Sequence, residues 1–184
     1  MNKGKDMARM FVFPGQGSQS IGMGKEWHRA FPVAKNVFQE IDDVLGQDLS
    51  GLMFHGNIEE LTLTENAQPA IMAASVATAK VIEAEILGSS DFCKYLAGHS
   101  LGEYSALCVA GSLTIAEAAH LLKARGRAMQ EAVRPGIGSM AALLGTNMLQ
   151  VAECLNKAEL QGVCQIANDN GGGQVIVSGH KSAG

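Results

Sequence analysis

The apolar residues of the chain form short runs and longer stretches with helical spacing. Residues 8–13 are a nearly continuous apolar run, which is typical of a strand buried on both faces in a parallel sheet. Residues 92–97 are a second short apolar run and predict another strand. Between them, residues 23–45 have helical spacing that is interrupted at Phe31 and Pro32, because a residue before proline leaves the helical region. We therefore predict two successive helices after the first strand.

A long helix is predicted to precede the second strand. It begins between Glu65 and Pro69, runs to about Leu87 and places an apolar stripe at Ile71, Ala74, Ile82 and Ile86. Thr78 lies on the same stripe, and its hydroxyl is expected to bond the carbonyl four residues earlier. Residues 88–91 are expected to form the loop that leads into the second strand.

The second predicted strand is followed by the sequence GHSLG at 98–102 and then by an alanine-rich helix that ends near 111–112. A strand that turns sharply into a helix needs small residues two before and two after the apex, and Gly98 and Gly102 meet this need. Ser100 would stand at the apex of such a nucleophile elbow, with the N–H of Leu101 directed at a developing oxyanion. The alternative is a glycine-rich turn with an ordinary capping serine.

A second glycine-rich loop follows the first strand. Gly15 and Gly17 flank Gln16 there, so the backbone can approach a ligand closely and offer a second oxyanion N–H. Taken by itself, this loop is equally consistent with a turn that ends a strand and has no chemical role.

The helix after Thr114 contains an arginine on its apolar side. Thr114 and Glu117 form a predicted capping box at its start. The apolar stripe of this helix consists of Ile115, Ala118, Leu122, Arg125 and Met129. A guanidinium in a site of low dielectric constant needs an anion, either a bound carboxylate or an internal one. The internal alternatives are Glu117, Glu103 and Asp91, and a side chain that reaches solvent from the edge of the stripe is a further alternative.

The last third of the chain predicts a small α+β subdomain. Strands are expected at 140–144, 162–167 and 174–178, with a helix at 148–158 and a hairpin turn at 168–173. We place the boundary between the two parts near 133–135 and divide the chain into domains 1–133 and 134–184.

Composition narrows the class of protein. A chain of 184 residues with 47% hydrophobic residues is sufficient for a globular domain with a substantial core. No apolar stretch is long enough for a membrane span, no signal peptide is evident, and cytoplasmic residence is expected. The formal charge of −4 includes no basic stripe for nucleic acid. The four cysteines lack the spacing of a zinc site or a disulfide framework and are expected to be buried thiols.

Three segments taken together resemble a known family: FPGQGSQ at 13–19, GHSLGEYSA at 98–106 and RGRAMQ at 125–130. The chain resembles the malonyl-CoA:acyl carrier protein transacylases of bacterial fatty acid synthesis from about Arg9 onward. The resemblance implies an α/β fold, with an α/β-hydrolase-like core that is incomplete here and an incomplete ferredoxin-like subdomain at the C-terminal end. It implies no cofactor and no metal.

The resemblance also assigns roles. Ser100 is the implied nucleophile, the backbone N–H groups of Gln16 and Leu101 form the implied oxyanion hole, and Arg125 is the implied partner of the malonyl carboxylate. The implied reaction moves the malonyl group from malonyl-CoA to the phosphopantetheine thiol of acyl carrier protein through a malonyl-serine intermediate. The complete enzyme is expected to be a monomer. Candidate docking residues for the acidic carrier protein are Lys123, Arg127, Arg134 and Lys181.

One family feature has no counterpart in the chain. The family's general-base histidine lies beyond the small subdomain, so we expect these residues to be the N-terminal part of an enzyme and inactive alone. His180 and His99 are given no catalytic role, the latter because a residue before an elbow serine points away from it. Structural or solvated roles are expected for His28, His55 and His120. The alternatives are a serine esterase or thioesterase, and an inactive fragment or interaction module.

Overall fold

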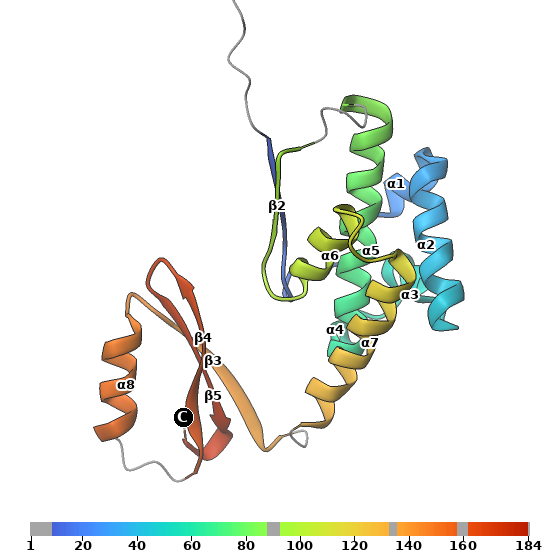
Figure 1. The fold of residues 1–184 in the computed structure, drawn as a ribbon. Helices are drawn as coiled ribbons and strands as arrows, with labels where there is room; N and C mark the ends of the chain where they lie inside the picture. The colour runs from blue at the N-terminus through green and yellow to red at the C-terminus, as the bar shows by residue number, and fades with distance from the viewer. Residues whose placement is uncertain (1–8, 88–92, 133–135, 158–161, 184) are drawn as a thin grey trace, which may run out of the picture. The chain divides into compact units, whose positions relative to one another are not determined.

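A computed structural model describes residues 9–87, 93–132, 136–157 and 162–183 (Figure 1). The chain divides into two compact units, Met1–Gln130 and Glu131–Gly184. The expected boundary at 133–135 and the expected loop at 88–91 lie outside the described residues.

The first unit contains a parallel pair of strands, β1 (Met10–Phe13) and β2 (Tyr95–Gly98), in a register that pairs Phe13 with Gly98. Phe13 is buried against Ala79 and Ala106, so helices cover this face of the pair. Met10 and Val12 point the other way and are 56% and 68% exposed, so the prediction that both faces of the first strand are buried is wrong in the described chain. Successive side chains of a strand alternate between faces, and only one face is packed here.

Helices fill the sequence between the two strands. Helices α1 (Lys25–Ala30) and α2 (Pro32–Leu45) are separated at Phe31 as predicted, with proline at the first position of α2. Two short helices, α3 (Leu49–His55) and α4 (Ile58–Thr62), were not predicted. Their start signals are the side chains of Asp48 and Asn57, which accept from the N–H groups of Gly51 and Glu59.

The long helix is α5 (Thr64–Ile82), which continues as one π-helical segment, η1 (Glu83–Leu87). Thr78 donates to the carbonyl of Ala74 at 2.8 Å, as predicted. Ile86 is 68% exposed and does not belong to the buried stripe. The wider π turn takes more residues than an α turn, so positions beyond Ile82 rotate away from the face that α5 buries.

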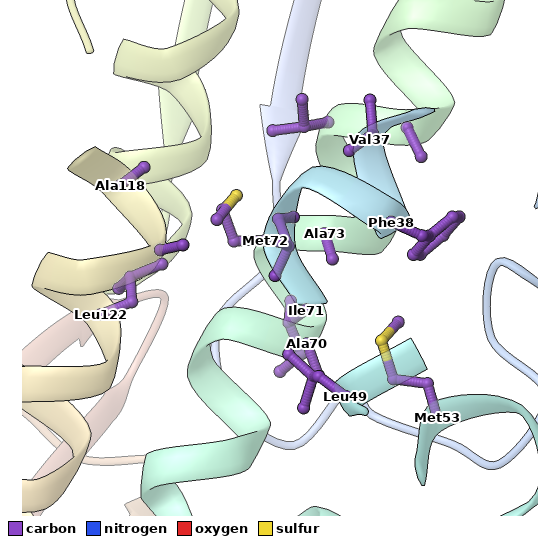
Figure 2. Close-up of a cluster of buried hydrophobic side chains, with 14 of the residues drawn as sticks. Val37, Phe38, Leu49, Met53, Ala70, Ile71, Met72, Ala73, Ala118 and Leu122 are labelled. Atoms are coloured by element: carbon purple, nitrogen blue, oxygen red, sulfur yellow. The ribbon is translucent and has the colours of Figure 1, made fainter. Parts of the chain in front are cut away.

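Helix α5 is the centre of the core (Figure 2). Ile71, Met72 and Val76 of α5 are buried, as are Phe38 of α2 and Met53 of α3. Helix α6 (Gly102–Val109) and helix α7 (Ile115–Glu131) complete the unit, and Ala118 and Leu122 of α7 belong to the same cluster. A large buried surface of this kind is the main source of stability for these helices.

Helix α7 begins with the predicted capping box. Glu117 accepts from the N–H and the hydroxyl of Thr114 at 2.9 and 2.8 Å, and the N–H of Glu117 donates to the Thr114 hydroxyl at 3.1 Å. These bonds lower the pKa of the Glu117 carboxyl, the backbone bond from Thr114 most of all. At the other end of the helix, Met129 is 47% exposed, so the predicted stripe ends before it.

The second unit contains the predicted order of strand, helix, strand and strand. The elements are β3 (Gly138–Leu144), α8 (Met148–Lys157), β4 (Cys164–Gly171) and β5 (Gln174–His180), followed by a single 3₁₀ turn, η3 (Lys181–Ala183). The sheet is antiparallel with the order β3-β5-β4, and Val151 and Val175 are buried. Two register shifts let β4 continue to Gly171, which shortens the predicted turn at 168–173 to two glycines.

The cysteines are free, as predicted, but they are not uniformly buried. Cys108 is buried, and burial raises the pKa of its thiol. Cys93 and Cys164 are partly buried, whereas Cys154 is exposed on α8, so the expectation of four buried thiols is wrong. Within the described ranges, no helix is both long and apolar enough to span a bilayer, and no cluster of His, Cys, Asp and Glu side chains is arranged to hold a metal ion.

Candidate active site

Ser100 stands at a sharp turn between β2 and α6. Its φ is +55°, and it is the one non-glycine residue with a positive φ in the part of the chain that the structure describes. A left-handed conformation costs a serine about 1–3 kcal/mol and persists only where the surrounding structure enforces it. The hydrogen bonds from Gly102 N to His99 O at 2.9 Å and from Glu103 N to Ser100 O at 3.1 Å close the turn. The Ser100 side chain is thereby held at an exposed apex.

The two glycines of the turn are required by packing. A Cβ on Gly98 would lie 2.0 Å from the backbone carbon of Gly102. A Cβ on Gly102 would lie 2.3 Å from the carbonyl oxygen of Phe13, at the end of β1. In both cases the obstacle is backbone, which cannot move without disturbing the strand pair. The geometry of a nucleophile elbow is therefore present.

Arg125 of α7 lies directly beside this serine. Its Nη2 donates to Ser100 Oγ at 3.0 Å, and its Nη1 donates to Gln68 Oε1 at 2.7 Å. Among the described residues no carboxylate lies within 4.0 Å of the guanidinium, so Glu103 and Glu117 are not its partners. Asp91, the third alternative, lies outside the described residues. The structure thus brings together a serine hydroxyl and a guanidinium that has no ion-pair partner within the described ranges.

A close approach of α7 to α5 places Arg125 there. The neighbouring residue Gly126 is buried, and a Cβ on it would lie 2.6 Å from the Cα of Glu65 and 2.6 Å from the carbonyl oxygen of Thr64. Only glycine lets the two backbones meet at this distance. The first turns of α5 are consequently within reach of the polar side chains of α7.

Gln68 is a site residue that the sequence analysis missed. It lies on α5 with no exposed surface, its oxygen accepts from Arg125, and its Nε2 donates to Met129 Sδ at 3.2 Å. A buried amide needs partners for both its donor and its acceptor groups. One feature of the sequence could have indicated this role. Gln68 directly precedes the apolar stretch that begins at Pro69 in the predicted helix, and an amide that is buried there is costly unless it has a specific partner.

The glycine-rich loop after β1 packs against the elbow. A Cβ on Gly15 would lie 2.5 Å from His99 Nδ1, so the histidine ring rests on the loop backbone. The Gln16 side chain donates to Thr64 Oγ1 at 3.4 Å, and Gln19 Oε1 accepts from Gly17 N at 2.8 Å. Within the described ranges, the N–H groups of Gln16 and Leu101 donate to no other protein group. Their role as an oxyanion hole stays a prediction.

Three charged side chains connect α5 and α7 beside the site. Lys123 Nζ lies 3.5 Å from Glu65 Oε2 and donates to Gln47 Oε1 at 2.7 Å, and Arg127 Nε donates to the same Glu65 oxygen at 3.0 Å. The hydrogen bond from Arg127 lowers the pKa of the Glu65 carboxyl, with Lys123 contributing and burial opposing. The Lys123 side chain is only 13% exposed, and its role in docking a carrier protein stays a prediction. Lys181 is exposed in the second unit, and Arg134 lies outside the described residues.

The histidines occupy varied surroundings. His28 is half-buried and packs against the rings of Phe38 and Phe54, with ring centroids 5.9 and 5.1 Å away, so the first of its two expected roles, a structural one, is confirmed. His55 Nδ1 lies 3.4 Å from Lys25 Nζ, and His120 is exposed. His180 lies in β5 against Gly162, in the other unit.

Known proteins share the sequence pattern of this chain over nearly its whole length. Residues 10–183 match the family described as "Acyl transferase domain". The malonyl CoA-acyl carrier protein transacylases of Bacillus subtilis and Escherichia coli are 46% and 42% identical over 92% and 94% of this chain, which correspond to 52% and 55% of those proteins. The chain thus spans about half the length of the curated relatives it matches.

Solved structures agree with these relatives. An acyl-carrier-protein-S-malonyltransferase from Bartonella henselae superposes with a TM-score of 0.88 at 53% identity, covering 96% of this chain and 56% of that one. A malonyl-transacylase in complex with a type II PKS acyl-carrier protein superposes with a TM-score of 0.85 at 41% identity, covering 95% and 55%. The mixed α/β fold is that of the malonyltransferases, and the chain belongs to the acyl transferase domain family.

Proposed function

We propose that this chain carries the nucleophile and the carboxylate-binding group of a transferase that moves malonyl groups from malonyl-CoA to acyl carrier protein in fatty acid biosynthesis. One observation carries the proposal: Arg125 lies 3.0 Å from Ser100 Oγ and has no carboxylate partner among the described residues. A guanidinium in this position would bind the free carboxylate of a malonyl group while the other end of that group reacts with the serine. The names of the relatives specify the same substrate and acceptor.

The proposed first step is acylation of the enzyme. Ser100 Oγ forms a bond to the thioester carbonyl carbon, and the electron pair of the carbonyl moves to its oxygen, which the N–H groups of Gln16 and Leu101 would stabilise. Collapse of this intermediate breaks the carbon–sulfur bond. The serine proton leaves with the departing thiolate, which becomes the thiol of coenzyme A.

The second step reverses the first with another thiol. The phosphopantetheine thiol of the carrier protein attacks the malonyl-serine carbonyl, its proton passes to Ser100 Oγ, and the carbon–oxygen bond breaks. An acetyl group has no carboxylate and would leave Arg125 without its ligand, so the site should favour malonyl-CoA over acetyl-CoA.

We also propose a division of the chain into two structural parts. We assign residues 1–133 to an α/β-hydrolase-like core and 134–184 to a ferredoxin-like subdomain. The parallel β1 and β2 pair with its elbow supports the first assignment, and the β3-β5-β4 order with α8 between β3 and β4 supports the second.

The test uses the complete natural protein that contains these residues. We expect malonyl-CoA to add the mass of one malonyl group to the Ser100 peptide and expect Ser100→Ala to abolish this addition. Arg125→Ala should slow malonylation while leaving acetylation nearly unchanged. Arg127→Ala is the matched control, since this arginine lies on the same helix, is 61% exposed and pairs with Glu65.

Three results would contradict the proposal. Covalent malonylation of the Ser100→Ala protein would exclude this serine as the nucleophile. An equal loss of malonyl and acetyl transfer in Arg125→Ala would exclude the carboxylate clamp. Hydrolysis that outruns transfer at saturating carrier protein would favour a thioesterase instead.

A further inference from the structure

We infer that Gln68 is the residue that gives Arg125 its selectivity for acyl groups with a carboxylate, and that its neutrality is essential to this role. The inference rests on the proposed function. Gln68 has no exposed surface, so it cannot itself serve as a substrate contact in the present structure. It acts through Arg125, as a positioning residue.

The first step of the argument concerns direction. Arg125 Nη1 donates to Gln68 Oε1 at 2.7 Å while Nη2 of the same group donates to Ser100 Oγ at 3.0 Å. The guanidinium is planar and rigid, so fixing one nitrogen restricts the position of the other. The bond to Gln68 therefore aims the remaining donors of Arg125 at the nucleophile.

The second step concerns the orientation of the amide. Arginine has only donors, so Gln68 must present its oxygen to it, and the amide nitrogen must find another acceptor. Met129 Sδ lies 3.2 Å from Gln68 Nε2 and supplies that acceptor. Met129 thereby explains which end of the buried amide faces Arg125.

The third step concerns charge. A glutamate at position 68 would also orient Arg125, but it would form an internal ion pair and compete with a bound carboxylate. The neutral amide aligns the guanidinium and leaves its full positive charge for the ligand. The neighbouring cations show the contrast, because Lys123 and Arg127 both lie beside the Glu65 carboxylate.

A serine contact makes the selectivity sharper. Ser100 Oγ accepts a hydrogen bond from Arg125 in this structure. A ligand carboxylate draws the guanidinium toward itself, because a charge-assisted bond is stronger than a bond to a hydroxyl. A neutral acyl group offers no such replacement. Discrimination between malonyl and acetyl groups thus needs a guanidinium that is oriented toward Ser100 and has no internal ion pair. Gln68 provides both conditions.

The experiment compares two variants of the complete natural protein. Gln68→Met keeps the volume and removes the acceptor, whereas Gln68→Glu keeps an acceptor and adds a negative charge. The rates of Ser100 acylation by malonyl-CoA and by acetyl-CoA are measured by intact mass, with kcat and KM separated, and folding is checked by thermal melting. Gln47→Ala is the matched control, because Gln47 accepts from Lys123 of the same helix and does not contact Arg125.

The expected result is a change in the ratio of the two rates. Gln68→Met should lower the rate of malonylation about 10- to 100-fold, because one hydrogen bond to a charged group is lost. The rate of acetylation should stay nearly unchanged. Gln68→Glu should lower malonylation at least as much, mainly through KM, and the loss should lessen as falling pH protonates the introduced carboxyl. Gln47→Ala should leave the ratio unchanged.

Other results would overturn the inference. A folded Gln68→Met or Gln68→Glu protein with the parent ratio, or one that loses both activities equally, would reduce Gln68 to a structural residue. If the parent protein forms no malonyl-serine at all, the proposed function itself fails. Measuring the parent protein alone distinguishes this outcome from a failure of the inference about Gln68.

Discussion

Replacing Gly126 with alanine should separate α5 from α7 and release Arg125 from its alignment. The new Cβ would lie 2.6 Å from Glu65 Cα and 2.6 Å from Thr64 O, whereas carbon contacts are normally about 3.5–4.0 Å. Both obstacles are backbone, so the helices must move apart by roughly 1 Å. The Arg125 Nη1 to Gln68 Oε1 distance, now 2.7 Å, would then exceed that of a hydrogen bond.

The effect on stability is the balance of two opposing terms. Overpacking a tight contact costs about 1–3 kcal/mol. Alanine is a better helix former than glycine by about 1 kcal/mol, which opposes the loss. We therefore expect a net destabilisation of up to about 2 kcal/mol and a fall in Tm of up to about 8 °C.

Thermal melting and the malonyl to acetyl acylation ratio, both measured on the complete natural protein, test this reasoning. The exposed Gln130→Ala on the same helix is the control and should change neither quantity appreciably. A Gly126→Ala protein that melts at the parent temperature and keeps its selectivity would show that the backbone contact does not position Arg125.

Three further changes have defined outcomes. Thr114→Ala removes the cap of α7 and should cost about 1 kcal/mol in the free energy of unfolding by denaturant titration, and a value near zero would contradict the capping role. Ser100→Gly should melt at a higher temperature than Ser100→Ala, because glycine adopts φ of +55° without strain; equal Tm values would argue against strain at the elbow. Folding lowers the pKa of the Glu65 carboxyl from its ordinary value of 4.5, so near that pH the unfolded chain binds more protons than the folded chain. The ion pair of Glu65 therefore contributes its full stability above pH 4.5 and loses it as the pH falls through the lower pKa of the folded state. Glu65→Gln should therefore flatten the dependence of unfolding free energy on pH below 4.5, and an unchanged slope would contradict the ion pair.

The sequence predicted the elements whose rules are local. The apolar runs, the break at Pro32, the capping box at Thr114 and the glycines around Ser100 each follow from residues a few positions apart. The position of Arg125 on an apolar stripe also indicated that its charge had a specific partner or ligand.

The remaining features depend on contacts between distant segments. Gln68 and Arg125 are 57 residues apart and meet only because Gly126 lets α7 approach α5. The burial of Lys123 depends on the same approach and could not be read from its charge. The exposure of Val12 depends on which face of β1 is covered, which alternation within a four-residue strand does not determine.

The most direct test of the central claim is a crystal structure of the complete natural protein with a malonyl group trapped on Ser100. The account predicts a carboxylate oxygen about 2.7–2.9 Å from a terminal nitrogen of Arg125, with the other terminal nitrogen still bonded to Gln68. A malonyl carboxylate that lies in solvent or binds a different cation, with Arg125 turned away, would contradict it.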